Sequence, residues 1–468
     1  MPNESHQPQA AGAGLPQDRL FRIAQFIGSY IPDAMTMAIL LMVVLAVAAV
    51  AIGNSPLEVL DAYYVGLWML LPFTMQMTLI LVLGSALAST RFFGRMIHTL
   101  SNLPRSEGQT IALSMATTCC LAYCFWGLSL ALAPLVAVSY ARQSERKGFP
   151  VDFPYLLSAN AAAGAIWQFG LSASAPLLMN TPEHFLQEET GLMPLTTTIW
   201  APATLIYLAI YLTSVFVIAR LLMPKEPRPI SLFPESCALA EKTLYAAANP
   251  ESAPPRSDRF AERLEASRWP CAVLTAALIS WLVYHVTVKG GGLQLNSLIT
   301  ALLAIGLLLH GSVLKFTKSL PRAAVTAWPV IVLYHLYAGV AGLLQHTSIG
   351  GDFANFFASI STQHTFPLYT LLAAAVVSVF VPSSGGQWVI QGFVTVKASA
   401  AVGVSAQRGL LALSVGDHVG NLVSPFWAVI AAGIARMDFR TYIGYNYVWV
   451  LLWVGLGALC FTFLPVLR

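Results

Sequence analysis

The segment Phe380-Val-Pro-Ser-Ser-Gly-Gly-Gln-Trp388 decides the fold of this chain. Apolar runs over residues 366–381 and 388–401 flank it, and as helices each reaches only ~20–24 Å, less than the ~30 Å hydrocarbon core of a bilayer. Pro382 removes a backbone donor, and the glycine pair that follows favours a bend. Bare backbone is stable inside a membrane only against protein or beside a watery cavity. The segment therefore predicts a re-entrant helical hairpin whose polar tip is a candidate binding site.

The composition is that of a membrane protein. The chain has 468 residues, of which 57% are hydrophobic and only 10% charged, whereas soluble domains carry about 25% charged residues. Several apolar runs near twenty residues indicate an all-α polytopic protein in a lipid bilayer. We find no nucleic-acid signature, and the six cysteines show no metal-ligand spacing, so no nucleic-acid partner, metal or other cofactor is expected. Residues 1–17 are rich in Gln, Pro, Ala and Gly, which predicts a disordered cytoplasmic tail.

The apolar runs before residue 224 form the first predicted transmembrane repeat, residues 18–223. Its predicted elements are, in order, an interfacial helix over 18–31, spans over 34–52 and 64–88 separated by an acidic loop over 54–61, a re-entrant hairpin over 110–141 broken at 125–129, a helix over 153–179 broken at 170–176, and a span over 199–223. A polar, proline-rich cytoplasmic linker over residues 224–268 follows.

The second half shows the same order of elements. A connecting span occupies residues 269–292, and the second repeat is residues 293–468. Its predicted elements are spans over 293–309 and 324–344 joined by a basic loop, the hairpin over 366–401, a polar patch at 417–421 followed by a half-helix over 424–435, and a final span over 442–464. Each half crosses four times, and one crossing joins them, so the second half is inverted. The sequence predicts about nine full crossings plus two hairpins, an architecture found in many secondary transporters.

The distribution of Lys and Arg supports this topology. Cytoplasmic loops of membrane proteins carry an excess of basic residues. With the N-terminus inside and the C-terminus outside, only four of the 25 Lys and Arg residues fall outside: Lys289, Lys397, Arg408 and Arg468.

The chain resembles a known family at Val381-Pro-Ser-Ser-Gly-Gly-Gln-Trp-Val-Ile-Gln-Gly392. Further matching pieces are Ile31-Pro-Asp33, Met75-Gln-Met77, Trp126-Gly127, Ser174-Ala-Pro-Leu-Leu178, and Asn421 with Pro425-Phe-Trp427. The sequence is similar to the bacterial short-chain fatty acid transporters, the acetoacetate/butyrate uptake family within the ion-transporter superfamily, over essentially everything beyond residue 18. That family usually has a glycine at Ser384 and a histidine at Gln387, and commonly a glutamate at Asp417. The resemblance implies uptake of short-chain fatty acids across a bacterial inner membrane, and it suggests a homodimer.

Four helix N-termini are predicted near the middle of the membrane, at the two hairpin tips and the two broken helices. Free N–H groups and the positive end of a helix dipole there can hold a carboxylate without Lys or Arg. A single small anion fits this supply better than a di- or tricarboxylate. The predicted substrate-binding residues are Trp126, Gly127, Ser129, Ser172, Ser174, Ser383, Ser384, Gly385, Gly386, Trp388 and Ser424. The aromatic residues near the tips, which are candidates for an apolar wall around an acyl chain, are Trp126, Trp167, Phe169, Trp388, Phe426 and Trp427.

Asp417 is the only acidic residue predicted deep in the membrane. A buried charge there is costly and usually pairs, protonates or binds a cation. We predict that Asp417 couples transport to Na⁺ or H⁺, with Asn421 one turn further on and Asn160 in the helix before the first break. His418 follows Asp417 directly, but adjacent residues of a helix point apart.

Four functions remain open at this point. The first is secondary transport of short-chain monocarboxylates, and the alternative is a dicarboxylate or other organic-anion carrier on the same scaffold. A remote alternative is an intramembrane hydrolase with Ser384, His418 and Asp417 as a triad, although the direct succession of acid and histidine is awkward for that geometry. A passive channel is the fourth, and the lone buried acid favours coupled transport over it.

Overall fold

The computed structural model describes residues 34–248, 259–325 and 327–463. The predicted tail over 1–17 and the interfacial helix over 18–31 lie outside the described residues. The described part of the chain is helical and contains no strand. Five of its helices are long and apolar enough to cross a membrane, or six if one bent pair counts as a single span. The chain is therefore an all-helical, multi-pass membrane protein.

The first helices depart from the expected boundaries. Helix α2 (Ala34–Ala51) agrees with the first predicted span, but α3 (Pro56–Met69) and α4 (Leu71–Ala88) replace the acidic loop and the single span expected after it. Ser55 caps α3: its hydroxyl accepts from the Glu58 N–H at 3.2 Å, and the Glu58 carboxylate accepts from the Ser55 N–H at 2.8 Å. A proline in the first turn completes this start signal. The predicted loop over 54–61 is therefore wrong.

The first hairpin consists of two long helices. After α5 (Arg91–Ser101), helices α6 (Glu107–Cys124) and α7 (Trp126–Arg146) are separated by a single extended residue, Phe125. The Thr117 and Tyr140 hydroxyls, one on each arm, lie 2.9 Å apart, so the arms pack side by side. The predicted fold-back at 125–129 is present, but both arms are longer than expected.

The broken helix of the first half begins with α8 (Phe153–Gly164), which tightens into the 3₁₀-helix η1 (Ala165–Phe169). The chain resumes in α9 (Ser174–Met179), which has only six residues. The remaining elements are α10 (Gln187–Thr190), η2 (Leu195–Thr197) and the long α11 (Pro202–Leu221). The break predicted at 170–176 thus begins where η1 ends.

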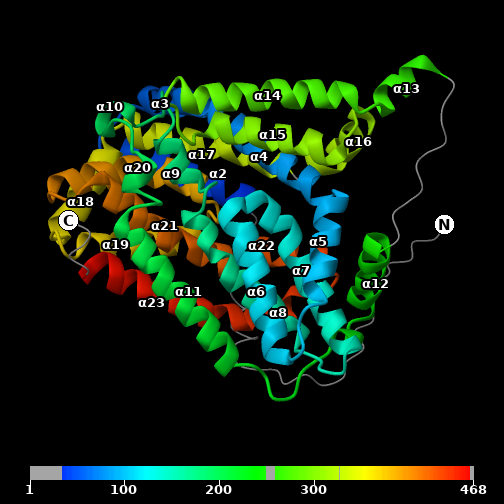
Figure 1. The fold of residues 1–468 in the computed structure, drawn as a ribbon. Helices are drawn as coiled ribbons and strands as arrows, with labels where there is room; N and C mark the ends of the chain where they lie inside the picture. The colour runs from blue at the N-terminus through cyan, green and yellow to red at the C-terminus, as the bar shows by residue number, and fades with distance from the viewer. Residues whose placement is uncertain (1–33, 249–258, 326, 464–468) are drawn as a thin grey trace, which may run out of the picture.

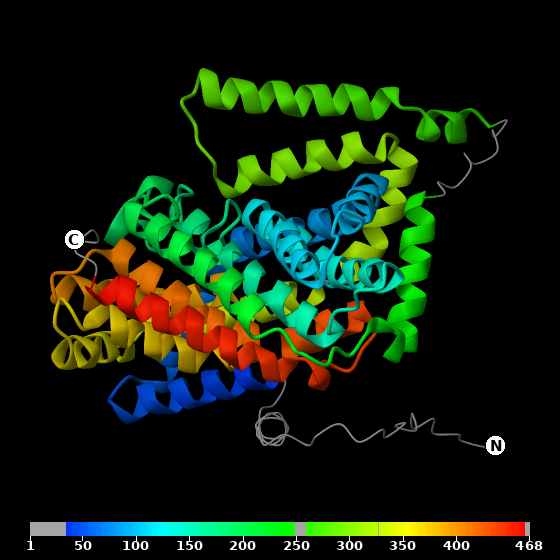
Figure 2. The same cartoon turned by 60° about the horizontal axis from the view of Figure 1, so that its bottom comes forward.

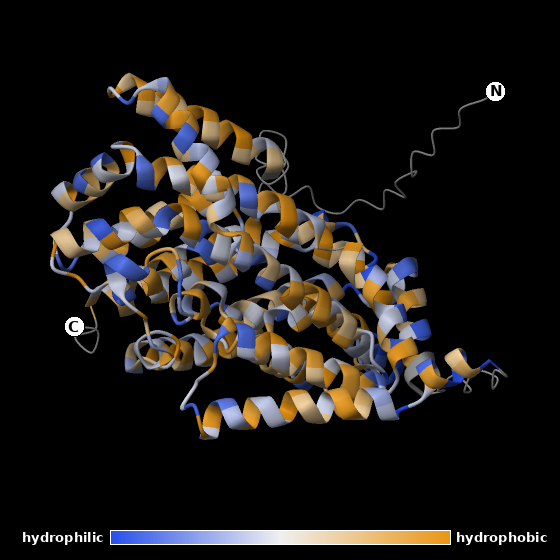
Figure 3. Cartoon of the chain, turned by 90° about the horizontal axis from the view of Figure 1, so that it is seen from above, coloured by the Kyte–Doolittle hydropathy of each residue, from blue (hydrophilic) through white to orange (hydrophobic). Residues whose placement is uncertain are grey.

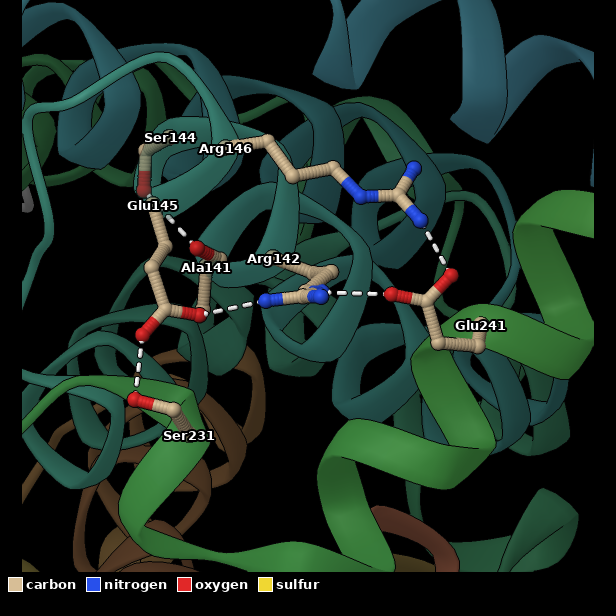
Figure 4. Close-up of polar contacts among 7 residues, drawn as sticks. All are labelled: Ala141, Arg142, Ser144, Glu145, Arg146, Ser231 and Glu241. Carbon is tan, nitrogen blue, oxygen red and sulfur yellow. Dashed lines mark hydrogen bonds and ion pairs between the residues drawn. The ribbon is translucent and has the colours of Figure 1, made fainter.

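The linker between the halves carries a docked helix. It contains η3 (Ile230–Leu232), α12 (Pro234–Ala248) and α13 (Phe260–Ala266), and α12 packs on α5 and α7. Glu241 on α12 accepts from Arg142 at 2.7 Å and from Arg146, while Arg142 also donates to Glu145 at 2.9 Å (Figure 4). Hydrogen bonds from Arg142 and then Arg146 lower the pKa of Glu241 below its ordinary value. These ion pairs join the linker to the end of the first hairpin.

The second half begins with α14 (Trp269–Thr287), which packs on α15 (Leu295–His310) at one edge of the molecule, opposite α2 (Figure 2). The basic segment over 313–325 and the segment over 349–360, which we did not expect to be helical, form the amphipathic helices α16 (Val313–Val325) and α18 (Ile349–Ile360). Between them α17 (Trp328–His346) is a long apolar helix.

The second hairpin comprises α19 (Phe366–Ser378) and α20 (Ser384–Ala401). The Gln387 side chain on α20 donates to the Ala374 carbonyl on α19 at 2.8 Å, so these arms also pack together. Helix α21 (Ala406–Val423) continues through the polar patch at 417–421, and the chain bends by 52° before α22. The last elements are α22 (Pro425–Ala435), η4 (Phe439–Thr441) and α23 (Ile443–Phe463).

Helices α19 and α21 pack with their backbones in contact. A Cβ atom added at Gly416 or Gly420 would collide with the carbonyl oxygens of Leu371 and Ser378, respectively. The Gly420 N–H donates to the Ser378 hydroxyl at 2.8 Å. Glycines four residues apart allow this approach, as in other membrane helix pairs. The second hairpin is thereby fixed against the helix that carries Asp417.

The long helices run between two ends of the molecule. Helices α10 and α18 lie at one end, and the linker helices α12 and α13 lie at the other (Figure 1). Hydrophobic residues run along the long helices, and hydrophilic residues gather mostly at their ends (Figure 3). This pattern is the one expected of helices that cross an apolar layer.

Candidate functional site

The two hairpin tips and both broken helices meet at one cavity of about 190 Å³. Among the described residues that line it, none is Lys, Arg, Asp or Glu. The lining combines serine and asparagine side chains with tryptophans and small aliphatic residues. Such a cavity, largely apolar with a few converging polar groups, is typical of small-molecule sites.

Seven of the predicted site residues line this cavity. Trp126 and Ser129 come from the first hairpin, and Ser383 and Ser384 come from the second. The other three are Ser174, Asn160 and Asn421. The structure thus brings together residues more than 250 positions apart, although their roles in binding remain predictions.

Three of the other predicted residues lie outside the lining of this cavity. Ser172 accepts a hydrogen bond from the Trp126 backbone N–H at 2.8 Å. Ser424 caps α22 by accepting from the Phe426 N–H at 3.3 Å. Gly127 lines a neighbouring cavity instead. Their positions suit a supporting role better than direct contact with a ligand.

The remaining three substrate-site candidates, in the first turns of α20, are buried in packing. Gly385 lies against Phe73 and Ser174, and Gly386 lies against Tyr337. Trp388 is fully buried and is absent from the cavity lining. Of the six aromatic residues expected to form an apolar wall, Trp126, Trp167 and Trp427 line the cavity, whereas Phe169, Trp388 and Phe426 do not. Within the part of the chain that the structure describes, no side chain caps the N-terminus of α20.

Asp417 is fully buried next to the cavity rather than in its lining. One of its oxygens, Oδ2, accepts from the Gln168 amide and from the Asn421 amide at 3.2 Å. The other oxygen, Oδ1, and the Gln168 Oε1 have no hydrogen-bond partner within residues that the structure describes. An unpaired carboxylate oxygen in a buried site is suited to a cation or a proton. The described residues contain no group of three or more His, Cys, Asp and Glu that could hold a metal.

His418 is a cavity residue that sequence reasoning missed. Its side chain is buried and lines the cavity, and neither ring nitrogen has a hydrogen-bond partner in the described part of the chain. The ring packs against Trp453 and Trp167, with centroids 4.9 and 5.8 Å away. Adjacent positions of α21 do point apart, as expected, but it is the histidine that faces the cavity.

Tyr334 on α17 is a second residue without a sequence signal. Its hydroxyl lies 2.9 Å from the Ser383 hydroxyl, and its ring stacks on Phe73 at 5.7 Å. It therefore holds the tip of the second hairpin at the cavity. Asn160 lines the cavity as well, and its Oδ1 accepts from Ser114 at 3.0 Å, which joins α8 to α6; its role in ion coupling stays a prediction.

A family model described as "short chain fatty acid transporter" matches residues 19–464. The chain belongs to the short-chain fatty acid transporter family. The function of this family member is therefore transport and not catalysis. The hydrolase hypothesis is wrong on geometry as well, because Asp417 bonds with Gln168 and Asn421, and the His418 ring nitrogens are unpaired among the described residues.

Two relatives support the assignment to the short-chain fatty acid transporters. A protein of Escherichia coli (strain K12), provisionally named a short-chain fatty acid transporter, is 29% identical over 90% of this chain and 94% of its own length. A protein of Haemophilus influenzae with the same provisional name is 28% identical over 90% of this chain and 93% of its own. Among solved structures, the Alcanivorax borkumensis YdaH transporter, described as having an unusual topology, is similar with a TM-score of 0.55 and 14% identity over 92% of this chain and 98% of that one. That likeness concerns the fold alone.

Proposed function

We propose that this protein is a secondary transporter for the uptake of short-chain monocarboxylates such as butyrate and acetoacetate, coupled to a cation. The observation that carries the proposal is the convergence of both hairpin tips on one small cavity whose lining, within the described residues, includes no basic side chain. Serine hydroxyls and the uncapped N-terminus of α20 can bind one carboxylate there. The tryptophans and small residues around them suit a short acyl chain.

The cavity favours a monocarboxylate over a dicarboxylate. A second carboxylate would have to lie against the apolar part of the lining, where Leu81, Leu130 and Val330 offer it no donor. Leaving a charged group without a hydrogen bond in such surroundings is strongly unfavourable. Succinate should therefore bind much more weakly than butyrate.

Asp417 is the proposed coupling group. Its buried carboxylate, with one oxygen held by Gln168 and Asn421 and the other unpaired among the described residues, can accept a Na⁺ ion or a proton. Asp417 and the cavity-lining His418 are adjacent residues in the same turn of α21, so this turn connects the proposed ion site with the substrate cavity. A lone ionisable group inside a membrane is functional more often than structural.

The proposed topology is that of two inverted repeats over residues 18–223 and 293–468 in a bacterial inner membrane. Both hairpins are re-entrant, the N-terminus is inside and the C-terminus outside, and the linker over 224–268 is cytoplasmic. The docking of α12 at one end of the bundle and the position of α18 at the other support this orientation (Figure 1). We also propose that the protein forms a homodimer.

Uptake by the purified protein in proteoliposomes tests the function. Labelled acetoacetate should accumulate when a Na⁺ gradient or a proton gradient is imposed separately, and unlabelled butyrate should compete. Competition by succinate as strong as that by butyrate would replace the monocarboxylate proposal with a dicarboxylate carrier. Equilibration without accumulation under either gradient would refute coupling.

A further inference from the structure

A second cavity, of about 410 Å³, adjoins the first. The two cavities share a wall made of Leu81, Leu130, Val330, Tyr334, Ser383 and Trp427. The second cavity is the larger, and of the polar residues of the candidate site only Tyr334 and Ser383, in the shared wall, are among the described residues that line it. The shared wall therefore decides how much room a bound ligand has.

Two hydrogen bonds fix this wall to the tip of the second hairpin. The Trp427 indole N–H donates to the Pro382 carbonyl at 2.6 Å, and the Tyr334 hydroxyl lies 2.9 Å from the Ser383 hydroxyl. The Trp427 side chain is only partly buried and lines both cavities, and its ring packs edge to face with Phe426, with the centroids 5.0 Å apart. An aromatic ring held in this way is a partition rather than part of a packed core.

The far side of the partition suits hydrocarbon. Among the described residues that line the second cavity none is charged, and the lining beyond the shared wall is mostly aliphatic and aromatic, with Leu333, Phe426 and Ile430 as examples. Burial of a carboxylate there would be unfavourable because few hydrogen-bond donors line it. Burial of each methylene group, in contrast, contributes about 0.8 kcal/mol, which is about fourfold in affinity. The first cavity is smaller than the ~300–1,000 Å³ of sites for larger ligands.

We infer that Trp427 sets the upper limit of acyl-chain length, by separating the carboxylate site from an apolar cavity that can hold the tail of a longer fatty acid. The inference rests on the proposed function, because it takes the carboxylate to be bound at the hairpin tips. The tail of a short acid ends at the indole. Removal of the indole joins the cavities, and a six- or eight-carbon monocarboxylate then fits with its tail in the second.

Competition for acetoacetate uptake tests this inference without relying on transport of the longer acids, which cross lipid unaided. Inhibition constants for butyrate, hexanoate and octanoate are measured in proteoliposomes for wild type, Trp427→Ala and the milder Trp427→Leu. Ile434→Ala is the matched control, since Ile434 lies on the same helix, α22, and lines only the second cavity. Its substitution enlarges that cavity but leaves the Trp427 indole in place.

In Trp427→Ala the inhibition constant of hexanoate relative to that of butyrate should fall by about 15-fold from the wild-type ratio, for two methylenes buried. Ile434→Ala should keep the wild-type ratio. A wild-type ratio in both Trp427 variants would overturn the inference while leaving the proposed function intact; failure of the wild type to take up acetoacetate would overturn the proposed function itself. Should neither Trp427 variant transport, the same comparison is made by ligand-induced shifts of melting temperature of the purified proteins, and the absence of a gain for hexanoate there refutes the inference.

Discussion

Replacement of His418 by phenylalanine separates binding from stability. The His418 ring is buried against Trp453 and Trp167 and faces the cavity, and neither of its nitrogens is bonded within the described residues. A phenylalanine has nearly the same shape, so the packing is kept while both nitrogens are lost. We expect His418→Phe to be at least as stable as wild type, because it removes buried polar atoms that lack partners.

The loss of affinity can be worked out from the bond that the ring would make. A neutral imidazole N–H in this cavity can donate to a substrate carboxylate. Hydrogen bonds to charged groups contribute about 1.5–3 kcal/mol, so losing one should weaken binding by about 10- to 150-fold. His418→Gln keeps an N–H donor and should recover most of that loss.

The assay measures KM and maximal rate of acetoacetate uptake in proteoliposomes, together with the melting temperature of each purified variant. His418→Phe should raise KM without lowering the melting temperature, and His418→Gln should lie close to wild type. If His418→Phe has the wild-type KM, His418 does not contact the substrate and the reasoning from its unpaired nitrogens fails. A melting temperature that falls in step with activity would instead show that the ring is structural.

Three further outcomes follow from the buried acid, the close helix pair and the docked linker. Asp417→Asn should abolish the response of uptake to an imposed Na⁺ or proton gradient, measured across pH and Na⁺ concentration; wild-type coupling in this variant would remove Asp417 from the mechanism. Gly420→Ala should cost about 1–3 kcal/mol of stability by overpacking, seen as a lower melting temperature, whereas Gly433→Ala, where an added Cβ meets nothing within 4 Å, should be neutral. The pKa of Glu241 is lowered in the folded state, so its ion pairs stabilise above the ordinary glutamate pKa of about 4.3 and are lost as the pH falls through the folded value. Glu241→Gln should thus lower the melting temperature slightly at pH 7 and by less as the pH falls below the ordinary glutamate pKa, and a loss that is the same at pH 7 and pH 3 would disprove this account.

The breaks in the chain were the most predictable part of the fold. Pro382 and the glycines after it mark the second tip, because local backbone chemistry decides where a helix must stop. The first tip, near Phe125, was predicted from the interruption of a long apolar run and from the same order of elements in both halves. The start of α3 was also readable, since Ser55 and Glu58 form a capping box ahead of an apolar run. Missing it produced the wrong loop over 54–61. The amphipathic helices α16 and α18 were missed because their apolar faces are too narrow to resemble spans.

Only those residues of the candidate site that carry a local sequence signal could be predicted. The serines at the tips were found because they lie in the breaks. Tyr334 was not, since its partner Ser383 is 49 residues away and no pattern in α17 sets one tyrosine apart. For Asp417 and His418 the sequence shows that they diverge, but which of them faces the cavity depends on the rotation of α21, and that rotation is set by its glycines against α19.

The contact of α19 with α21 also bears on how tightly the proposed transport of the acid is linked to that of the ion. Where backbone rests on backbone, no rotamer change can absorb a shift, so the two helices must travel as one piece. In the coupling proposed above, an ion bound at Asp417 on α21 would therefore strengthen binding of the acid at Ser383 and Ser384, in the tip that follows α19, and loss of the acid would weaken binding of the ion, since linked sites influence each other equally. The close packing that Gly416 and Gly420 allow would thereby suppress slippage, which is the transport of one solute without the other.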